Sequence, residues 1–100
     1  MRGKNVPRLI EIPQVGSSEM GHIQILDGWD GLPFIPKRVY WTTGVPVDTI
    51  RGQHAHKTLW QLIVAVSGEL ELQLENPKGK VGSFVLNRRD VGLVIPPMHW

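Results

Sequence analysis

The stretch that decides the fold is LWQLIVAVSGELELQLE, residues 59–75. Its first half, residues 59–66, is almost wholly apolar, which is typical of a strand buried on both faces. In residues 69–75, three leucines alternate with four polar residues, so this strand has one buried face and one wet face. Ser67 and Gly68 lie between the two runs and predict a tight turn that joins them as a hairpin. The stretch is that of a β-protein.

Short strands separated by turn residues continue on both sides of this stretch. Asn76 to Gly79 predict a turn, and Pro96 and Pro97 predict a strand stop. Strands with Gly and Pro between them predict an all-β sandwich or barrel, here one domain over residues 1–100. A closed barrel needs more strands, so the barrel is expected to be incomplete at its C-terminus or to have edges that a partner subunit covers. The further strands predicted are residues 22–27, 38–43, 81–86 and 93–95.

Composition excludes several classes of protein. The net charge is +2 and the basic residues are scattered in pairs, so nucleic acid is not an expected partner. The absence of cysteine excludes disulfides, zinc–thiolate sites and cysteine nucleophiles. The longest apolar run, residues 62–66, is far too short to cross a bilayer, and no signal peptide is recognisable. We therefore expect a cytoplasmic protein with no membrane partner.

The run RGQHAHK, residues 51–57, carries the strongest chemical signal in the chain. In an extended strand, His54 and His56 point to the same side because side chains alternate with a period of two. If that side is the inside of a β-barrel, two imidazoles converge on one cavity. Such a pair either holds a metal or moves protons.

The spacing around the histidine pair resembles the first motif of cupin barrels, which reads His-x-His, four residues, Glu, six residues, Gly. Gln61 replaces the metal-binding Glu, Gly68 fits, and Asp48 stands where a glycine is expected. A carboxamide is a weak ligand, and the ligand histidine of the second cupin motif would fall just after Trp100. A metal-free site is therefore favoured, and a metal, if bound, would be held by the two histidines.

A wider set of residues resembles a narrower family, the WxcM-like cupins. The resemblance covers roughly residues 20 to 100 and implies a sugar 3,4-ketoisomerase that acts on dTDP-4-dehydro-6-deoxy-glucose, on a cupin-type jelly roll. It also implies neither a metal nor another cofactor, and a homodimer with exchanged N-terminal strands. The residues that carry it are Arg38-Val39-Tyr40, residues 51–57, Gln61, residues 92–97 and Trp100.

The chemistry of a 3,4-ketoisomerase accounts for these residue types. A base removes the C3 proton beside the C4 ketone, an acid delivers a proton to C4, and the C3 hydroxyl becomes the new ketone. Imidazole suits both tasks because its ordinary pKa is about 6.5, and the resemblance favours His56 over His54 as the C3 base. The enolate oxygen needs a donor, for which Arg38, Tyr40 and Gln61 are the candidates.

Two further cations, Arg51 and Lys57, flank the histidine pair. Arg51 and Lys57 lie at the other strand parity to the histidines, so they either reach the substrate diphosphate or lie in solvent. His22 and His99 are predicted to be structural, and Arg88 with its neighbour to be a solvated corner.

Two rival functions stay open. One is a metal-dependent cupin enzyme of the oxygenase type, and the other is a non-catalytic nucleotide-sugar-binding cupin.

Overall fold

The computed structural model describes residues 6–27, 32–51, 58–79 and 81–99 of the chain. All regular secondary structure in these ranges is β-strand, and nothing in them forms a helix able to cross a membrane. The strands are β1 (Arg8–Glu11), β2 (Gln14–Ser17), β3 (Gly21–Gln24), β4 (Gln61–Val64), β5 (Leu70–Glu75), β6 (Val81–Leu86) and β7 (Val91–Ile95).

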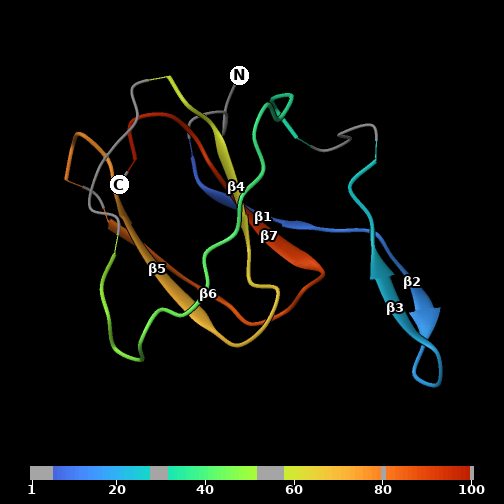
Figure 1. The fold of residues 1–100 in the computed structure, drawn as a ribbon. Helices are drawn as coiled ribbons and strands as arrows, with labels where there is room; N and C mark the ends of the chain where they lie inside the picture. The colour runs from blue at the N-terminus through green and yellow to red at the C-terminus, as the bar shows by residue number, and fades with distance from the viewer. Residues whose placement is uncertain (1–5, 28–31, 52–57, 80, 100) are drawn as a thin grey trace.

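The strands form three antiparallel sheets that do not close on one another (Figure 1). One sheet has three strands in the order β1-β7-β4, and the hairpins β2–β3 and β5–β6 make the other two. The β2–β3 hairpin projects to one side of the molecule, away from β5 and β6. The prediction of an all-β fold with an unclosed barrel is confirmed within the described residues.

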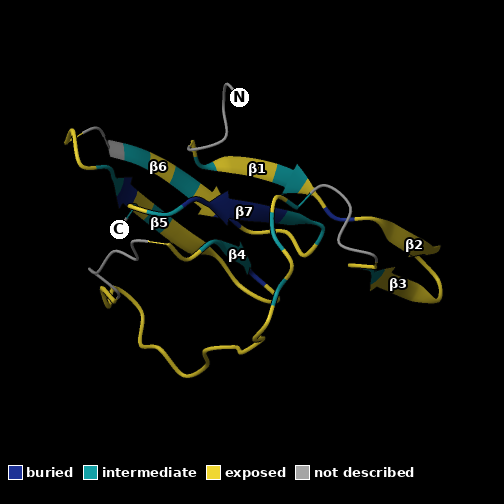
Figure 2. Cartoon of the chain, turned by 90° about the horizontal axis from the view of Figure 1, so that it is seen from above, coloured by how far each residue is buried: buried dark blue, intermediate teal, exposed yellow. Residues whose placement is uncertain are grey.

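The core lies between the three-stranded sheet and the β5–β6 hairpin, with β7 as its most buried strand (Figure 2). Leu93 and Val94 of β7 are fully buried, and Leu74 and Leu86 pack from the hairpin. Each fully buried leucine stabilises the fold by about 1.5–3 kcal/mol relative to an exposed one. The buried cluster is Ala65, Leu74, Leu86, Leu93 and Ile95, with Ile63, Leu72, Phe84 and Val91 half-buried around it.

Gly92 allows β4 to pack closely against β7. A Cβ atom at this position would lie 2.7 Å from Leu62 Cδ1 and 3.3 Å from Val64 Cγ2. Both side chains belong to β4, which pairs directly with β7. Because Gly92 has no side chain, Leu62 and Val64 can pack close to β7 on the face of β4 that points away from the core.

The strongest sequence signals are confirmed. The predicted strands 69–75 and 81–86 match β5 and β6 closely, and β4 lies within the predicted strand 59–66. The predicted turn after β5 is held by two hydrogen bonds, in which Lys78 N donates to Asn76 Oδ1 at 2.9 Å and Gly79 N donates to Asn76 O at 2.9 Å. Asparagine is common in turns because its side-chain oxygen can accept a hydrogen bond from the backbone two residues further on, and this is why Asn76 predicted the turn.

The predicted hairpin between residues 59–66 and 69–75 is wrong. β4 pairs with β7 and β5 pairs with β6, so the two adjacent runs lie in different sheets. Gly68 does bend the chain, with φ 75°, but the bend leads from one layer of the core to the other. The apolar faces of β4 and β5 cover each other when the two strands lie in separate layers, and they could not do so as neighbours in one sheet.

The strand predicted over residues 38–43 is also absent. This part of the chain forms no ladder with any described residue, and Val39 and Trp41 remain 75% and 79% exposed. Two strands near the N-terminus, β1 and β2, were not predicted. They have four residues each and mostly exposed side chains, so the period-two signal that marks a buried strand is missing.

Candidate active site

Gln61 is the one member of the predicted site that lies in regular structure among the described residues. It begins β4, is half-buried, and stands directly across from Ile95 of β7. Because Ile63 and Ile95 both pack into the core, the two-residue alternation of a strand puts Gln61 on that same inner face. The amide therefore belongs to the interior side of the sheet, as a substrate-facing donor requires.

Arg38, Tyr40 and Arg51 lie on a long segment without regular secondary structure, residues 32–51. The segment runs outside β4, one of the two edge strands of the three-stranded sheet (Figures 1 and 2). All three side chains are exposed, and that of Tyr40 is 67% exposed. The segment thus carries these three groups past β4, the strand that Gln61 begins, but it leaves their side chains exposed.

The two predicted catalytic histidines, His54 and His56, lie outside the described residues, as does Lys57. Their positions in the chain are bracketed by Arg51 on one side and by β4 on the other. The predictions about their direction and roles stay predictions.

Asp48 explains the departure from the cupin glycine pattern. Its φ angle is 64°, in the left-handed region that glycine favours, and Thr49 N donates to Pro46 O at 3.3 Å to close a turn around it. Aspartate is among the few residues with a Cβ that tolerate this conformation. The backbone shape that a glycine would permit is therefore present without the glycine.

A pair of stacked aromatic rings joins the segment to the sheet. The ring centroids of Phe34 and Trp60 are 6.3 Å apart and the planes meet at 19°. Trp60 immediately precedes Gln61, and Phe34 lies four residues before Arg38. The stack therefore connects two parts of the chain that carry predicted site residues.

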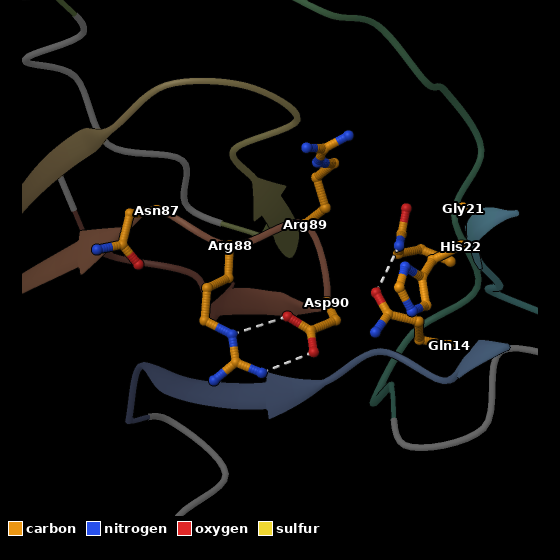
Figure 3. Close-up of a pocket in the computed structure, with 8 residues that line it drawn as sticks. Gln14, Gly21, His22, Asn87, Arg88, Arg89 and Asp90 are labelled. Atoms are coloured by element: carbon orange, nitrogen blue, oxygen red, sulfur yellow. Dashed lines mark hydrogen bonds and ion pairs between the residues drawn. The ribbon is translucent and has the colours of Figure 1, made fainter. Parts of the chain in front are cut away.

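A separate hollow of about 420 Å³ lies between the β2–β3 hairpin and the corner that links β6 to β7 (Figure 3). None of the described residues predicted to act in catalysis lines it. Ile12 N donates to Asp90 O at 2.7 Å, which ties the base of the hairpin to the corner. The lining residues are Gln14, Gly21, His22, Gln24, Asn87, Arg88, Arg89 and Asp90.

The charges of this hollow are partly compensated. Arg88 forms a two-pronged ion pair with Asp90, with distances of 2.9 Å from Nε to Oδ1 and 2.7 Å from Nη2 to Oδ2. The hydrogen bonds of this pair lower the pKa of Asp90 and raise the pKa of Arg88. Arg89 extends away from the pair. Sequence reasoning predicted a solvated corner here, and it did not detect that His22 lies opposite, because some 65 residues separate the two walls in the chain.

Comparison with known proteins gives a match over nearly the whole chain. Residues 5–100 match the model of the family described as WxcM-like, C-terminal (FdtA). A curated relative from Aneurinibacillus thermoaerophilus, TDP-4-oxo-6-deoxy-alpha-D-glucose-3,4-oxoisomerase, is 30% identical over 80 residues. Those residues are 80% of this chain and 57% of the relative, so the chain spans little more than half of that protein.

Solved structures of sugar 3,4-ketoisomerases share the fold. QdtA from Thermoanaerobacterium thermosaccharolyticum, in complex with TDP, has a TM-score of 0.86 and 33% identity, and the match covers 100% of this chain and 70% of that one. A 3,4-ketoisomerase from Helicobacter canadensis has a TM-score of 0.85 and 29% identity, covering 95% of this chain and 70% of that one. With the family match and the predicted cupin-type jelly roll both in place, this chain belongs to the WxcM-like, C-terminal (FdtA) family.

Proposed function

We propose that this protein is a nucleotide-sugar 3,4-ketoisomerase that converts dTDP-4-keto-6-deoxyglucose into a dTDP-linked 3-keto-6-deoxyhexose. The observation that carries the proposal is the match of the described fold to QdtA, a sugar 3,4-ketoisomerase solved with TDP. A variant of QdtA has also been solved with TDP-4-keto-6-deoxyglucose, and it has a TM-score of 0.86 to this chain at 32% identity. The substrate is assigned on that support.

The reaction needs only proton transfers, so the substrate and the product have the same composition and no oxidant or reductant is required. A base removes the hydrogen on C3 as a proton, and its electron pair forms the C3–C4 double bond while O4 gains a proton. The resulting enediol then loses the proton of O3, the C3–O3 bond becomes a carbonyl, and C4 takes a proton. Positioned acid–base groups accelerate such steps by roughly 10²–10⁴-fold.

We assign these transfers to the two histidines, with His56 as the C3 base and His54 as its acid partner, and with Arg38 and Tyr40 acting on the developing charge at O4. Gln61 supports this assignment because its amide lies on the inner face of the sheet, where an N–H donor can meet an enolate oxygen. Arg51 and Lys57 are assigned to the substrate diphosphate, for which two cations at the rim are suited.

We also propose that two copies of the chain form a homodimer with exchanged N-terminal strands. The β2–β3 hairpin supports this, because a two-stranded hairpin is at best marginally stable alone. Its apolar side chains are largely uncovered, with Val15 53%, Ile23 63% and Met20 89% exposed. A second copy would cover them. A cytoplasmic location stays a prediction, which cell fractionation can test.

Incubation with dTDP-4-keto-6-deoxyglucose in heavy water tests the function. We expect a 3-keto product that carries deuterium at C4, observed by NMR, and we expect this turnover to survive removal of metals by a chelator. Tight binding of the sugar nucleotide without exchange would mean a binding protein instead. Activity that depends on stoichiometric bound iron, manganese or nickel would support the metal-dependent cupin.

The histidine roles are tested by His54→Asn and His56→Asn. Each variant should lose about 10²–10⁴-fold in kcat with an unchanged far-UV circular dichroism spectrum. His99→Asn is the matched control, because His99 is a half-buried histidine whose Nδ1 lies 3.0 Å from Pro97 O and which has no proposed role. If both motif variants keep wild-type turnover, the acid–base assignment is wrong.

A further inference from the structure

The Phe34–Trp60 stack stands out because its surroundings are open. Both rings are half-buried, whereas Ile35 and Leu59, their neighbours in the chain, are 73% and 48% exposed. The near-parallel planes and the centroid distance of 6.3 Å are those of an offset aromatic pair. The two rings are therefore covered by their contact while the residues next to them in the chain stay exposed.

This stack is a fixed point of the segment that carries Arg38 and Tyr40. Among the described residues, no hydrogen bond or ion pair joins residues 32–51 to the rest of the chain. The turn closed by Thr49 N and Pro46 O lies inside the segment and fixes nothing to the sheet. The ring contact of Phe34 is thus a defined side-chain contact that links the start of the segment to the start of β4.

The chain distances make this anchoring relevant to the site. Trp60 is directly bonded to Gln61, and Arg38 follows Phe34 by four residues, which is about 13 Å of extended chain. A displacement of about 1 Å between groups that must act together costs on the order of 10²-fold in rate. A single anchor near both sets of groups therefore has a direct effect on their alignment.

We infer that Phe34 and Trp60 form a positioning pair, which holds the segment bearing Arg38 and Tyr40 in register with β4 and Gln61. The inference rests on the proposed function, because it is expressed in the rate of the isomerisation. Neither ring needs to touch the substrate. Their stack acts through the residues whose place it fixes.

The test measures kcat and KM for Phe34→Ala and Phe34→Tyr. The alanine variant removes the ring and should lower kcat by about 10–100-fold, while the tyrosine variant keeps the ring and should restore at least half of the wild-type rate. Phe84→Ala is the matched control. It removes a half-buried phenylalanine of β6 from the core, so it should lower the melting temperature with a much smaller effect on kcat.

A double-mutant cycle separates positioning from simple destabilisation. If Phe34 acts through Tyr40 or Arg38, its alanine substitution should cost much less in a Tyr40→Phe or Arg38→Gln background than in the wild type. An equal loss in all three backgrounds, or an unchanged kcat in Phe34→Ala, would overturn the inference. A wild-type protein without turnover would instead refute the proposed function, so the two failures are distinguishable.

Discussion

At the scale of single residues, Asp48 shows how a backbone conformation can survive the loss of its usual residue. Its φ of 64° lies in a region that costs a residue with a Cβ about 1–2 kcal/mol, with aspartate and asparagine penalised least. We expect Asp48→Gly to leave the free energy of unfolding unchanged or slightly higher, and Asp48→Val to lower it by about 1–2 kcal/mol. Urea denaturation of the three proteins measures both differences. Equal stability of the valine variant would show that the turn has relaxed out of the left-handed region.

The Arg88–Asp90 pair gives a pH dependence whose sign is fixed. The pair lowers the pKa of Asp90 from its ordinary value of 3.8, so its stabilising effect is fully present above about pH 4. That effect is lost as the pH falls through the lowered pKa of the folded state. We expect Asp90→Asn to melt below the wild type at pH 6 and the difference to shrink toward pH 2. The side chain of Arg88 is 65% exposed and that of Asp90 is 22% exposed, so solvent reaches the pair, the difference is small and salt reduces it.

Arg89→Gln is the control for this measurement, because it removes a cation from the same corner without breaking the pair. The Ile12 N–Asp90 O hydrogen bond uses the main chain and is retained in Asp90→Asn. A melting-temperature difference that grows on acidification would contradict the assigned sign.

At the scale of elements, the β2–β3 hairpin depends on a glycine. Gly16 has φ 137° and pairs with His22, and a Cβ at this position would lie 2.1 Å from the carbonyl oxygen of Gly21. That neighbour is backbone and cannot move aside without breaking the ladder. We therefore expect Gly16→Ala to open the hairpin, seen as faster hydrogen exchange of the amides in β2 and β3. Gly44→Ala is the control, since it also has a positive φ but meets nothing within 4 Å and lies outside the sheets.

The element that the sequence predicts most clearly, β5, has one buried face. In β5, three leucines face the core side and the alternation is unmistakable, whereas β1 and β2 are short, exposed and separated only by residues 12–13. Which strands pair with one another was harder to predict from the sequence. A run of apolar residues such as β4 does not reveal whether its partner is the next strand in sequence or β7, because both offer a suitable face.

In the candidate site too, some features have a local sequence signal and others depend on contacts between distant residues. The motif spacing singled out Gln61, and the strand that this residue begins puts it on the inner face of the sheet, while its role stays a prediction. The strand predicted for Arg38 and Tyr40 is absent, because the segment that carries them forms no ladder in the described chain. The hollow beside His22 and the Phe34–Trp60 stack are tertiary contacts between distant residues, for which a single sequence carries no local signal.

At the scale of the whole molecule, the exposed apolar side chains are not evenly spread. They concentrate on the β2–β3 hairpin and on residues 35–50, two parts of the chain that add little to the buried core. Solitary exposed apolar residues are normal, but grouped ones mark a surface that associates. This distribution is the physical reason to expect a second copy to cover the hairpin, and it makes the dimer interface the place to test.

Ile23 is the residue on which this test turns. It pairs across the hairpin with Val15, is 63% exposed, and would be buried in the proposed dimer. Burial of an isoleucine contributes about 1.5–3 kcal/mol, so Ile23→Lys should weaken dimerisation by roughly 10–100-fold or more in sedimentation-velocity titrations. Ile23→Val keeps an apolar, β-branched side chain and should change the dissociation constant much less. Val47→Lys, at a position that is 90% exposed outside the hairpin, tests whether any added charge has the same effect. If the wild type sediments as a monomer at all concentrations, the hairpin does not join two copies of this chain, and its apolar face must be covered in another way.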